Sequence, residues 1–315
     1  MAIALTFPGQ GSQSVGMGKA FFDEFQVARD VFAEIDSALD QKLSSLMFEG
    51  PEDQLTLTAN AQPALMAVSI AALRVLEHEA GLDLKKHVAF VAGHSLGEYS
   101  ALAAAGSLTL ADTARLLRTR GNAMQAAVAP GVGAMAALLG LDFDKAALVA
   151  AEAAQGEVCQ AANDNGGGQV VVSGSKSAVE RAVELAKAQG ARRAVMLAVS
   201  APFHCALMQP AADAMAAALA EVSVQAPIVP LVGNLSASAG SDPTAIRHAL
   251  VAQVTGTVRW RESVEWMASQ GVKQFIEVGS GKVLTGLVKR IAAEAEGLSV
   301  SNPDDIGLFH SQVVL

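Results

Sequence analysis

A serine flanked by glycines is the first feature of this sequence that could do chemistry. It lies in Gly93-His94-Ser95-Leu96-Gly97, between an apolar stretch and an alanine-rich one. At a sharp turn from strand to helix a serine hydroxyl projects outward, glycines avoid clashes, and the next backbone amide can stabilise an oxyanion. The pattern predicts a nucleophilic Ser95, and the alternative is a serine that caps a helix.

A nucleophilic serine needs a base, and His204 has the most distinctive context of the six histidines. It follows a predicted strand at residues 194–199 and a turn at 200–202. A position at a strand exit and near a helix start disfavours protonation and leaves a neutral imidazole that accepts a proton. An ordinary buried histidine is the alternative. We expect His94 to form a wall of the site, because the turn directs its side chain away from that of Ser95.

An arginine on an apolar helix face gives an independent clue. At about 100° per residue, the predicted helix 110–127 carries Leu116, Leu117 and Met124 on one face, with Arg120 in the middle of it. Burying a guanidinium is costly unless an anion meets it, and its planar donors fit a carboxylate. Arg120 therefore predicts a bound substrate carboxylate, and an internal ion pair with Asp or Glu is the alternative.

Two further patterns resemble ligand sites but fail the tests for them. The segment from Pro8 to Gln13, PGQGSQ, lacks the third glycine of a dinucleotide loop and the ending of a P-loop. Its backbone amides, that of Gln10 among them, are free to line a site. The two cysteines, Cys159 and Cys205, lack metal-site spacing, so we expect no bound metal.

The composition predicts a globular chain with a large aliphatic core. Its 315 residues are 51% hydrophobic, 17% charged and 4% aromatic, which excludes low-complexity disorder. A net charge of -9 argues against a nucleic-acid partner. The uncharged stretch 121–141 is interrupted by proline and glycine, and the apolar residues 3–7 lack the flanks of a signal peptide. We therefore expect a cytoplasmic protein with no membrane partner.

Outside the middle of the chain, strand-like and helix-like segments alternate. Helices are expected at 96–105 and 110–127. This order is typical of a mainly parallel sheet covered by helices, so we predict a large α/β domain formed by residues 1–127 and 199–315. The buried strands of this domain are expected at residues 3–7, 88–92, 228–232 and 274–278.

The middle of the chain, residues 128–198, has a tighter pattern. Its order is β-α-β-β-α-β, which predicts a ferredoxin-like α+β subdomain inserted into the larger domain. Ser177 and Glu180 have the spacing of a capping box at the start of its second helix. The expected strands are 134–139, 158–162, 170–173 and 194–199, the helices are 145–154 and 178–189, and residues 165–168 form the turn between the paired strands.

The collected motifs resemble the malonyl-CoA:acyl carrier protein transacylases of fatty-acid synthesis. The similarity runs through PGQGSQ from Pro8, GHSLGEY from Gly93, RGNAMQ from Arg120, HCALM from His204 and EVGSGKVLTGL from Glu277. It spans nearly the whole chain, and the family's α/β domain with a ferredoxin-like insertion agrees with the layout above. The resemblance implies transfer of a malonyl group from malonyl-CoA to the phosphopantetheine thiol of acyl carrier protein, by a ping-pong mechanism through a malonyl-serine ester.

Residue by residue, the resemblance implies Ser95 as nucleophile and His204 as its base. The backbone amides of Gln10 and Leu96 would form the oxyanion hole. The segment at Gln253 would orient the histidine through a backbone carbonyl, so no aspartate is expected in a triad. The substrate-binding residues of this interpretation are Arg120, which would hold the malonyl carboxylate, Gln253, His94, Met124, Asn163 and Phe203.

The partner that the resemblance implies needs a local basic surface. Acyl carrier proteins are usually acidic and this chain is acidic too, so net charge cannot attract them. The compact basic pairs Arg192-Arg193 and Lys289-Arg290 predict a docking patch, and ordinary solvated surface is the alternative. We expect a monomer with no permanently bound cofactor, for which the coenzyme A thioester is a substrate.

Three other functions remain open at this point. An α/β-hydrolase esterase or thioesterase shares the serine turn and would use Asp242 and His248, but it leaves Arg120 unexplained. A catalytically inactive scaffold that binds carrier proteins would keep the fold, although the intact Ser95 and His204 argue against it. An acyltransferase of the same family that serves polyketide synthesis is the third alternative.

Overall fold

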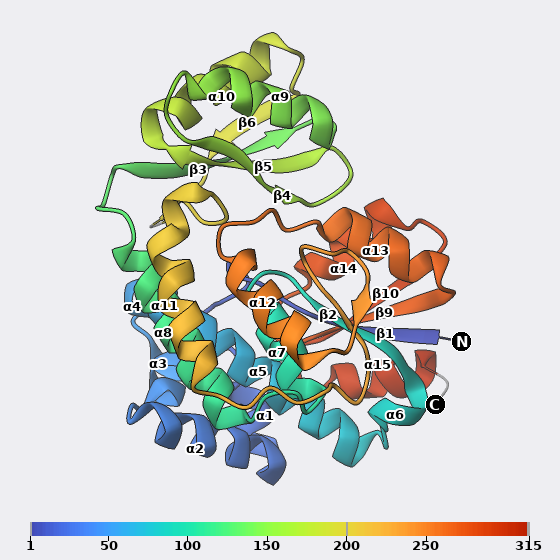
Figure 1. Cartoon of the computed structure of the whole chain (residues 1–315). Coiled ribbons are helices and arrows are strands. Elements are labelled where there is room, and N and C mark those ends of the chain that lie inside the picture. The colour runs from blue at the N-terminus through green and yellow to red at the C-terminus, as the bar shows by residue number, and fades with distance from the viewer. Residues whose placement is uncertain (1, 200, 314–315) are drawn as a thin grey trace.

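Two β-sheets organise the chain, one above the other in the view of Figure 1. The structure, a computed structural model, describes residues 2–199 and 201–313. In the larger sheet all neighbouring strands are parallel except the last pair. Its strands are, in spatial order, β10 (Glu296–Val300), β9 (Val272–Val278), β1 (Ala2–Phe7), β2 (Val88–Gly93), β7 (Leu231–Val232) and β8 (Ala239–Gly240).

Helices cover both faces of the larger sheet, which confirms the predicted α/β class. In β1 the side chains of Ile3 and Leu5 join one apolar cluster and that of Ala4 joins another, so the strand is apolar on both faces. The Ala4 cluster includes α13 (Trp260–Ser269) and α14 (Val283–Ile291). The other cluster draws on α1 (Lys19–Glu24), α2 (Gln26–Leu39), α3 (Leu43–Glu49), α4 (Glu52–Thr56), α5 (Thr58–Glu79), α6 (Leu84–His87), α7 (Gly97–Ala104), α8 (Leu110–Ala126), α11 (Gln209–Ala220), α12 (Pro243–Gln253) and α15 (Asp305–Gln312).

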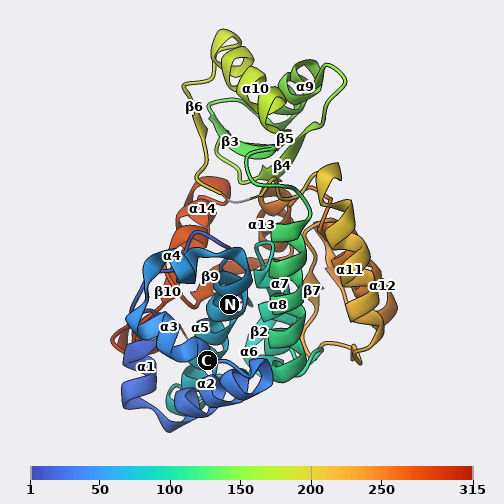
Figure 2. The same cartoon turned by 90° about the vertical axis from the view of Figure 1, so that its left-hand side faces the viewer.

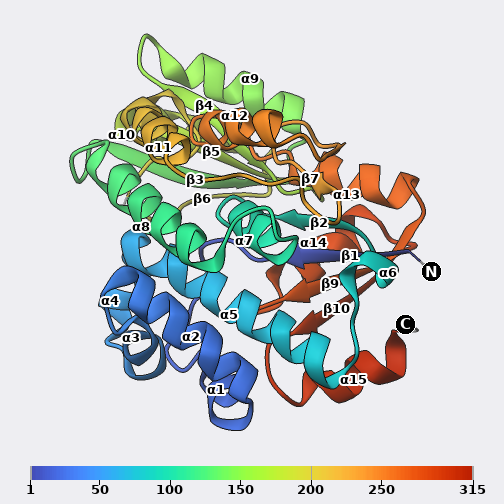
Figure 3. The ribbon, with the colours of Figure 1, turned by 60° about the horizontal axis from the view of Figure 1, so that its bottom comes forward.

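The long helix α5 is the centre of this packing. It lies between α2 and the larger sheet in Figure 3. By length and composition it could cross a membrane, but 83% of its most apolar window is buried inside the protein. A helix that is apolar all round and covered on all sides belongs to a protein core. The apolar character of α5 is therefore explained by its packing.

The smaller sheet is antiparallel and stands at one end of the molecule, as Figure 2 shows. The helices α9 (Phe143–Ala154) and α10 (Lys176–Ala188) pack on one of its faces. The chain order β-α-β-β-α-β is the one predicted for a ferredoxin-like module, and the strand order also matches that fold. Its strands are, in spatial order, β4 (Cys159–Asp164), β5 (Gln169–Ser175), β3 (Gly133–Leu139) and β6 (Arg193–Met196).

Three local predictions were wrong. The capping box does not form, because α10 begins at Lys176 and the Ser177 hydroxyl donates instead to Glu157 Oε1 at 2.6 Å. The strand expected at 194–199 ends at Met196, because the chain then turns and the Val199 amide donates to the carbonyl of Leu197. The strand expected at 228–232 is only two residues long, since the prolines at 227 and 230 carry no N–H for a ladder.

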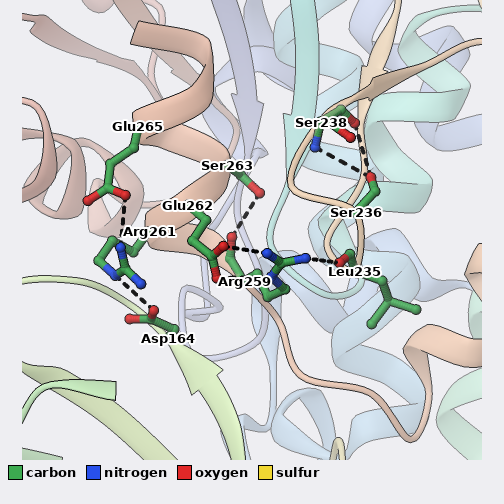
Figure 4. Close-up of polar contacts among 9 residues, drawn as sticks. All are labelled: Asp164, Leu235, Ser236, Ser238, Arg259, Arg261, Glu262, Ser263 and Glu265. Carbon is green, nitrogen blue, oxygen red and sulfur yellow. Dashed lines mark hydrogen bonds and ion pairs between the residues drawn. The ribbon is translucent and has the colours of Figure 1, made fainter. Parts of the chain in front are cut away.

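A buried aspartate joins the smaller sheet to the larger domain. Asp164, at the end of β4, accepts a hydrogen bond from Arg261 Nε at 2.8 Å, and Arg261 also donates to Glu265 (Figure 4). The backbone continues the connection: the Val258 amide donates to Ala162 O at 2.8 Å, and the Asp164 amide donates to Val258 O at 2.9 Å. These bonds hold the smaller sheet in a set position above the serine turn.

Arg259 holds the segment just before α13, which includes Val258, against the larger domain. Its Nε donates to Glu262 Oε1 at 2.9 Å, and Nη1 donates to the carbonyl of Leu235 at 2.8 Å (Figure 4). Its own carbonyl accepts from the hydroxyl of Ser263. The segment before α13 is thus tied to the larger domain as well as to the smaller sheet.

Gly121 lets α8 cross α5 at close range, and we expect Gly121→Ala to destabilise the fold. An added Cβ would lie 2.6 Å from Ala59 Cα and 2.7 Å from the Thr58 carbonyl oxygen, which are backbone atoms. Overpacking of this kind costs about 1–3 kcal/mol. Urea unfolding followed by circular dichroism measures the change.

The matched control is Gly286→Ala in α14, where an added Cβ meets nothing within 4 Å. There the better helix propensity of alanine should stabilise the protein by up to about 1 kcal/mol. Equal unfolding free energies for the two variants would contradict the close crossing of α5 and α8.

Candidate active site

Ser95 occupies a strained turn between β2 and α7. Its φ is 53°, in the left-handed region. A Cβ on Gly93 would lie 1.9 Å from the Gly97 carbonyl carbon, and one on Gly97 would lie 2.2 Å from the Phe7 carbonyl oxygen. Only glycine fits at both positions, so the sequence pattern around the serine is the pattern that this turn requires.

His204 contacts the serine hydroxyl in the arrangement of a nucleophile and its base. Ser95 Oγ lies 2.8 Å from His204 Nε2, and His204 Nδ1 lies 2.9 Å from the backbone carbonyl oxygen of Gln253. Because a carbonyl only accepts, Nδ1 carries the proton and Nε2 is left to accept one from the serine. Burial, together with the positive charge of Arg120, lowers the pKa of His204 to about 3. The imidazole is therefore neutral at physiological pH.

Arg120 lies beside the same hydroxyl and is 1% exposed. Its Nη1 donates to Gln62 Oε1 at 2.8 Å, and its Nη2 donates to Gln253 Oε1 at 2.8 Å and to Ser95 Oγ at 3.1 Å. Among residues 2–199 and 201–313, no carboxylate forms an ion pair with this guanidinium. The direct internal ion pair considered as an alternative is not found, and a buried cation remains available to an anion.

Two backbone amides near the serine have no protein acceptor among the described residues, one in the loop after β1 and one in the serine turn itself. β1 and β2 are parallel neighbours that pair Phe7 with Gly93, so the loop after β1 lies against the serine turn. Within the described part of the chain, neither the Gln10 amide nor the Leu96 amide donates to a protein acceptor. Leu96 also precedes the first turn of α7, where the helix dipole favours negative charge. An oxyanion could be stabilised at this point.

A cavity of about 310 Å³ opens over Ser95 between the two sheets. Its floor comes from the larger domain and its roof from β3, β4 and β5 of the smaller sheet. His94 is held in the wall by Asn165, whose Oδ1 lies 2.9 Å from His94 Nε2, and burial lowers the pKa of His94. The residues predicted from the sequence that line this cavity are Gln10, His94, Ser95, Leu96, Arg120, Met124, Asn163, Phe203 and His204.

Gln253 lies behind the cavity rather than in its lining. It is fully buried at the end of α12 and contacts Arg120 through its side chain and His204 through its carbonyl. The four basic residues of the predicted docking patch are all exposed, outside the cavity: Arg192, Arg193, Lys289 and Arg290.

Sequence reasoning missed two residues that support the serine turn. Asn234 Oδ1 accepts from the Ser95 amide at 2.8 Å, and its Nδ2 donates to Gly93 O at 2.6 Å. Glu98 accepts from Gln253 Nε2 at 2.6 Å, and burial raises the pKa of Glu98 to about 7. An acidic residue inside the otherwise uncharged helix α7 was a sequence signal for Glu98, whereas nothing near Asn234 distinguished it.

The residues that an esterase would use lie elsewhere. Asp242 is exposed and caps α12 by accepting from the Ala245 amide at 2.7 Å. His248 is exposed on the same helix, and neither residue lines the cavity over Ser95. In the part of the chain that the structure describes, no group of three or more His, Cys, Asp or Glu side chains could hold a metal ion.

Comparison with known proteins identifies the family. Residues 5–303 match the model of the acyl transferase domain. The chain belongs to the acyl transferase domain family. The protein is therefore an acyltransferase, and the serine, histidine and buried arginine described above lie in the cavity of an acyltransferase.

Relatives of this acyltransferase resemble it over nearly their whole length. The malonyl CoA-acyl carrier protein transacylase of Escherichia coli (strain K12) is 48% identical over 300 residues, which cover 95% of this chain and 96% of the relative. The crystal structure of the acyl-carrier-protein-S-malonyltransferase from Bartonella henselae is 60% identical, covers 98% of each chain and has a TM-score of 0.95. A malonyl-transacylase in complex with a type II PKS acyl-carrier protein is 43% identical, covers 98% of this chain and 99% of that one, and has a TM-score of 0.94.

The low pKa of His204 predicts a flat pH profile for the reactivity of Ser95. A base is active when deprotonated, and a pKa of about 3 keeps His204 deprotonated throughout pH 5–8. The rate of Ser95 modification by a fluorophosphonate should therefore stay constant over this range and be lost in His204→Ala. An ordinary histidine of pKa about 6.5 would be only about 3% neutral at pH 5.

Glu98 is the control in this measurement, because its pKa of about 7 falls inside the same range. The profile is recorded for the wild type and for Glu98→Gln, so that titration of this carboxyl group is not mistaken for that of His204. A rate that falls with a midpoint near pH 6.5 in both proteins would show that His204 titrates normally.

Proposed function

We propose that this acyltransferase passes a malonyl group from malonyl-CoA to the phosphopantetheine thiol of acyl carrier protein, with Ser95 as the intermediate carrier. The names of its relatives support the two substrates. The single observation that carries the proposal is a buried arginine without a carboxylate partner among the described residues, 3.1 Å from a serine hydroxyl that faces a neutral histidine. The serine can carry an acyl group, and the arginine beside it can bind a carboxylate at the other end of that group.

In the first half-reaction Ser95 Oγ attacks the thioester carbonyl carbon of malonyl-CoA. His204 Nε2 takes the hydroxyl proton, and the amides of Gln10 and Leu96 donate to the oxyanion of the tetrahedral intermediate. When the intermediate collapses, the carbon–sulfur bond breaks and His204 returns the proton to the departing thiolate. Free coenzyme A leaves, and Ser95 holds malonate as an ester.

In the second half-reaction the carrier-protein thiol attacks the same ester carbonyl. His204 takes the thiol proton and then gives it to Ser95 Oγ as the carbon–oxygen bond breaks, which restores the free enzyme. Two substrates thus use one site in turn, so the kinetics are ping-pong. Water competes for the ester, and an enclosed cavity that orients the acyl group favours the thiol.

Arg120 is proposed to select the malonyl group. The free carboxylate of a malonyl ester is separated from the ester carbonyl by one methylene group, within reach of a guanidinium that contacts the serine oxygen. Gln253 is proposed to position both Arg120 and His204, a role supported by its contacts with each. The walls proposed to bind the rest of the acyl group are His94, Met124, Asn163 and Phe203.

We infer that the enzyme works in the cytoplasm, in fatty-acid synthesis, as a monomer without a permanently bound cofactor. Two buried free thiols, Cys159 and Cys205, suit a reducing compartment. We also keep the division into a large domain, residues 1–127 and 199–315, and a subdomain, residues 128–198. A separate apolar cluster confined to the smaller sheet and its two helices supports this division.

The carrier protein is proposed to dock on the two basic pairs, which flank one glycine turn. Gly167 faces the side chain of Arg290, and Gly168 accepts from the amide of Gly140, which in turn faces Arg192. The pairs therefore lie on either side of the turn between β4 and β5. Their exposure leaves them free to meet acidic side chains.

The proposal is tested directly by mixing the protein with malonyl-CoA. Intact-protein mass spectrometry should find one malonyl adduct, which peptide mapping places on Ser95, and Ser95→Ala should form none. Ser14→Ala, at an exposed serine outside the site, is the matched control and should be acylated like the wild type. An unmodified wild-type protein would refute the proposed function.

Arg120→Ala should abolish malonyl selectivity without abolishing acyl transfer. Removing one partner of a buried ion pair costs about 3 kcal/mol or more, so kcat/KM for malonyl-CoA should fall about 100-fold or more. Transfer from acetyl-CoA should be retained or increase, because it offers no carboxylate. Steady-state assays with both thioesters measure the ratio.

Arg118→Ala is the matched control for this measurement. Arg118 lies on the same helix but donates to Asn60 and Gln41, so its removal should leave the malonyl to acetyl ratio unchanged. Equal losses of malonyl and acetyl transfer in Arg120→Ala would count against a carboxylate-binding role.

Reversing the basic pairs should weaken carrier-protein binding. Glutamate at Arg192 and Arg193, or at Lys289 and Arg290, should raise the carrier-protein KM about fivefold or more at low salt, and added salt should reduce the difference. Lys85 and Lys86 of α6, at the opposite end of the molecule from the smaller sheet (Figures 1 and 2), provide the matched control pair. An unchanged KM at low salt in both double variants would remove the docking proposal.

A further inference from the structure

Glu98 is a buried carboxyl group that takes no part in the acyl transfer described above. It is the second residue of α7 and is 1% exposed. Its Oε2 accepts from Gln253 Nε2 at 2.6 Å and from the Asn234 amide at 3.3 Å. Within the described residues it forms no ion pair with a lysine or arginine. Burial of a carboxyl group in such a place is costly, so its presence indicates a role that a neutral side chain would not fulfil.

Gln253 stands between Glu98 and Arg120, and its amide has two unlike ends. Nε2 only donates, and it contacts Glu98 and the Ser95 carbonyl, the latter at 3.0 Å. Oε1 only accepts, and it faces Arg120 Nη2 at 2.8 Å. A flipped amide would put its oxygen against the carboxylate and its hydrogens against the guanidinium. Above its pKa of about 7 Glu98 is a carboxylate, and because a carboxylate only accepts, it then imposes the orientation that suits Arg120.

The same carboxylate also supports the serine turn, through its contact with Asn234. The backbone amide of Asn234 donates to Glu98, while the Asn234 side chain accepts from the Ser95 amide and donates to the Gly93 carbonyl. The Glu98 carboxylate therefore orients both Asn234, which supports the turn of Ser95, and Gln253, which contacts the guanidinium. An uncharged side chain with N–H groups of its own can donate as well as accept, so it would not fix the orientation of Gln253 or Asn234.

The distance between the two charges matters as much as the orientation. A carboxylate bound directly to Arg120 would occupy the two donors that a substrate carboxylate needs and would neutralise the charge before any substrate arrived. With one amide between them, the two opposite charges still attract each other, and this attraction opposes the burial that raises the pKa of Glu98. The guanidinium keeps its capacity to bind a second anion.

We propose that Glu98 is a positioning residue, which acts through Gln253 to hold Arg120 toward the cavity while remaining one side chain away from it. The guanidinium is thereby oriented and electrostatically compensated, yet free to bind the carboxylate of the acyl group. This inference rests on the proposed malonyl transfer.

Glu98→Gln tests the proposal, because it keeps the shape and removes both the charge and the acceptor-only character. At pH 8, where Glu98 is mostly ionised, the ratio of kcat/KM for malonyl-CoA to kcat/KM for acetyl-CoA should fall about tenfold or more, since only malonyl transfer uses Arg120. Both values come from one preparation, so the ratio does not depend on the fraction of protein that folds. Glu98→Asp, which keeps the charge, should give a ratio between those of the wild type and Glu98→Gln.

Two controls separate this role from a general structural one. Asp36→Asn removes another buried carboxylate, which accepts from the amide and hydroxyl of Ser44 away from the site, and it should keep the ratio within twofold of the wild type. In an Arg120→Ala background, Glu98→Gln should change the ratio less than twofold, because the positioned group is absent.

Proportional losses of malonyl and acetyl transfer in Glu98→Gln would overturn the proposal. The same fall of the ratio in the Arg120→Ala background, or a lower ratio in Glu98→Asp than in Glu98→Gln, would also overturn it. A wild-type protein that forms no malonyl ester removes the proposed function and this inference together. A wild type that forms the ester, with an unchanged ratio in Glu98→Gln, removes the inference alone.

Discussion

The buried charge of Arg120 is the constraint around which this site is built. A guanidinium that is 1% exposed needs acceptors, and here neutral ones, Gln62 and Gln253, hold it in place without cancelling its charge. The same charge lies close enough to His204 to help lower the pKa of the imidazole. Selection of a charged acyl group and maintenance of a neutral base therefore depend on one side chain in the proposed mechanism.

The backbone around Ser95 connects the site to the fold. A left-handed serine, two glycines that allow close contact and the parallel pairing of β1 with β2 place the loop that holds Gln10 against the turn that holds Ser95 and Leu96. The smaller sheet then closes the cavity from above, and the Asp164–Arg261 contact holds it there. In the proposed mechanism the catalytic groups thus come from the larger domain, while the smaller sheet supplies the enclosure that favours acyl transfer over hydrolysis.

Much of the fold and of the site could be predicted because the relevant signals are local. Alternating strands and helices predict the α/β class, a glycine-flanked serine predicts a turn, and an arginine on an apolar stripe predicts a buried cation. The capping-box prediction failed for a reason that is not local. Ser177 found a partner in Glu157, which is 20 residues away in the chain, so the capping-box spacing was overridden by a tertiary contact.

The sequence by itself determined which elements form and which residues have chemistry to offer, since periodicity and residue type are properties of short segments. Only the tertiary structure decided which groups meet. His204 and Ser95 are 109 residues apart, and Glu98 and Gln253 are 155 apart, so their contacts depend on how the elements pack. The absence of a carboxylate on Arg120 within the described chain is likewise a result of packing, because the sequence does not show which of its 31 Asp and Glu residues approach this arginine.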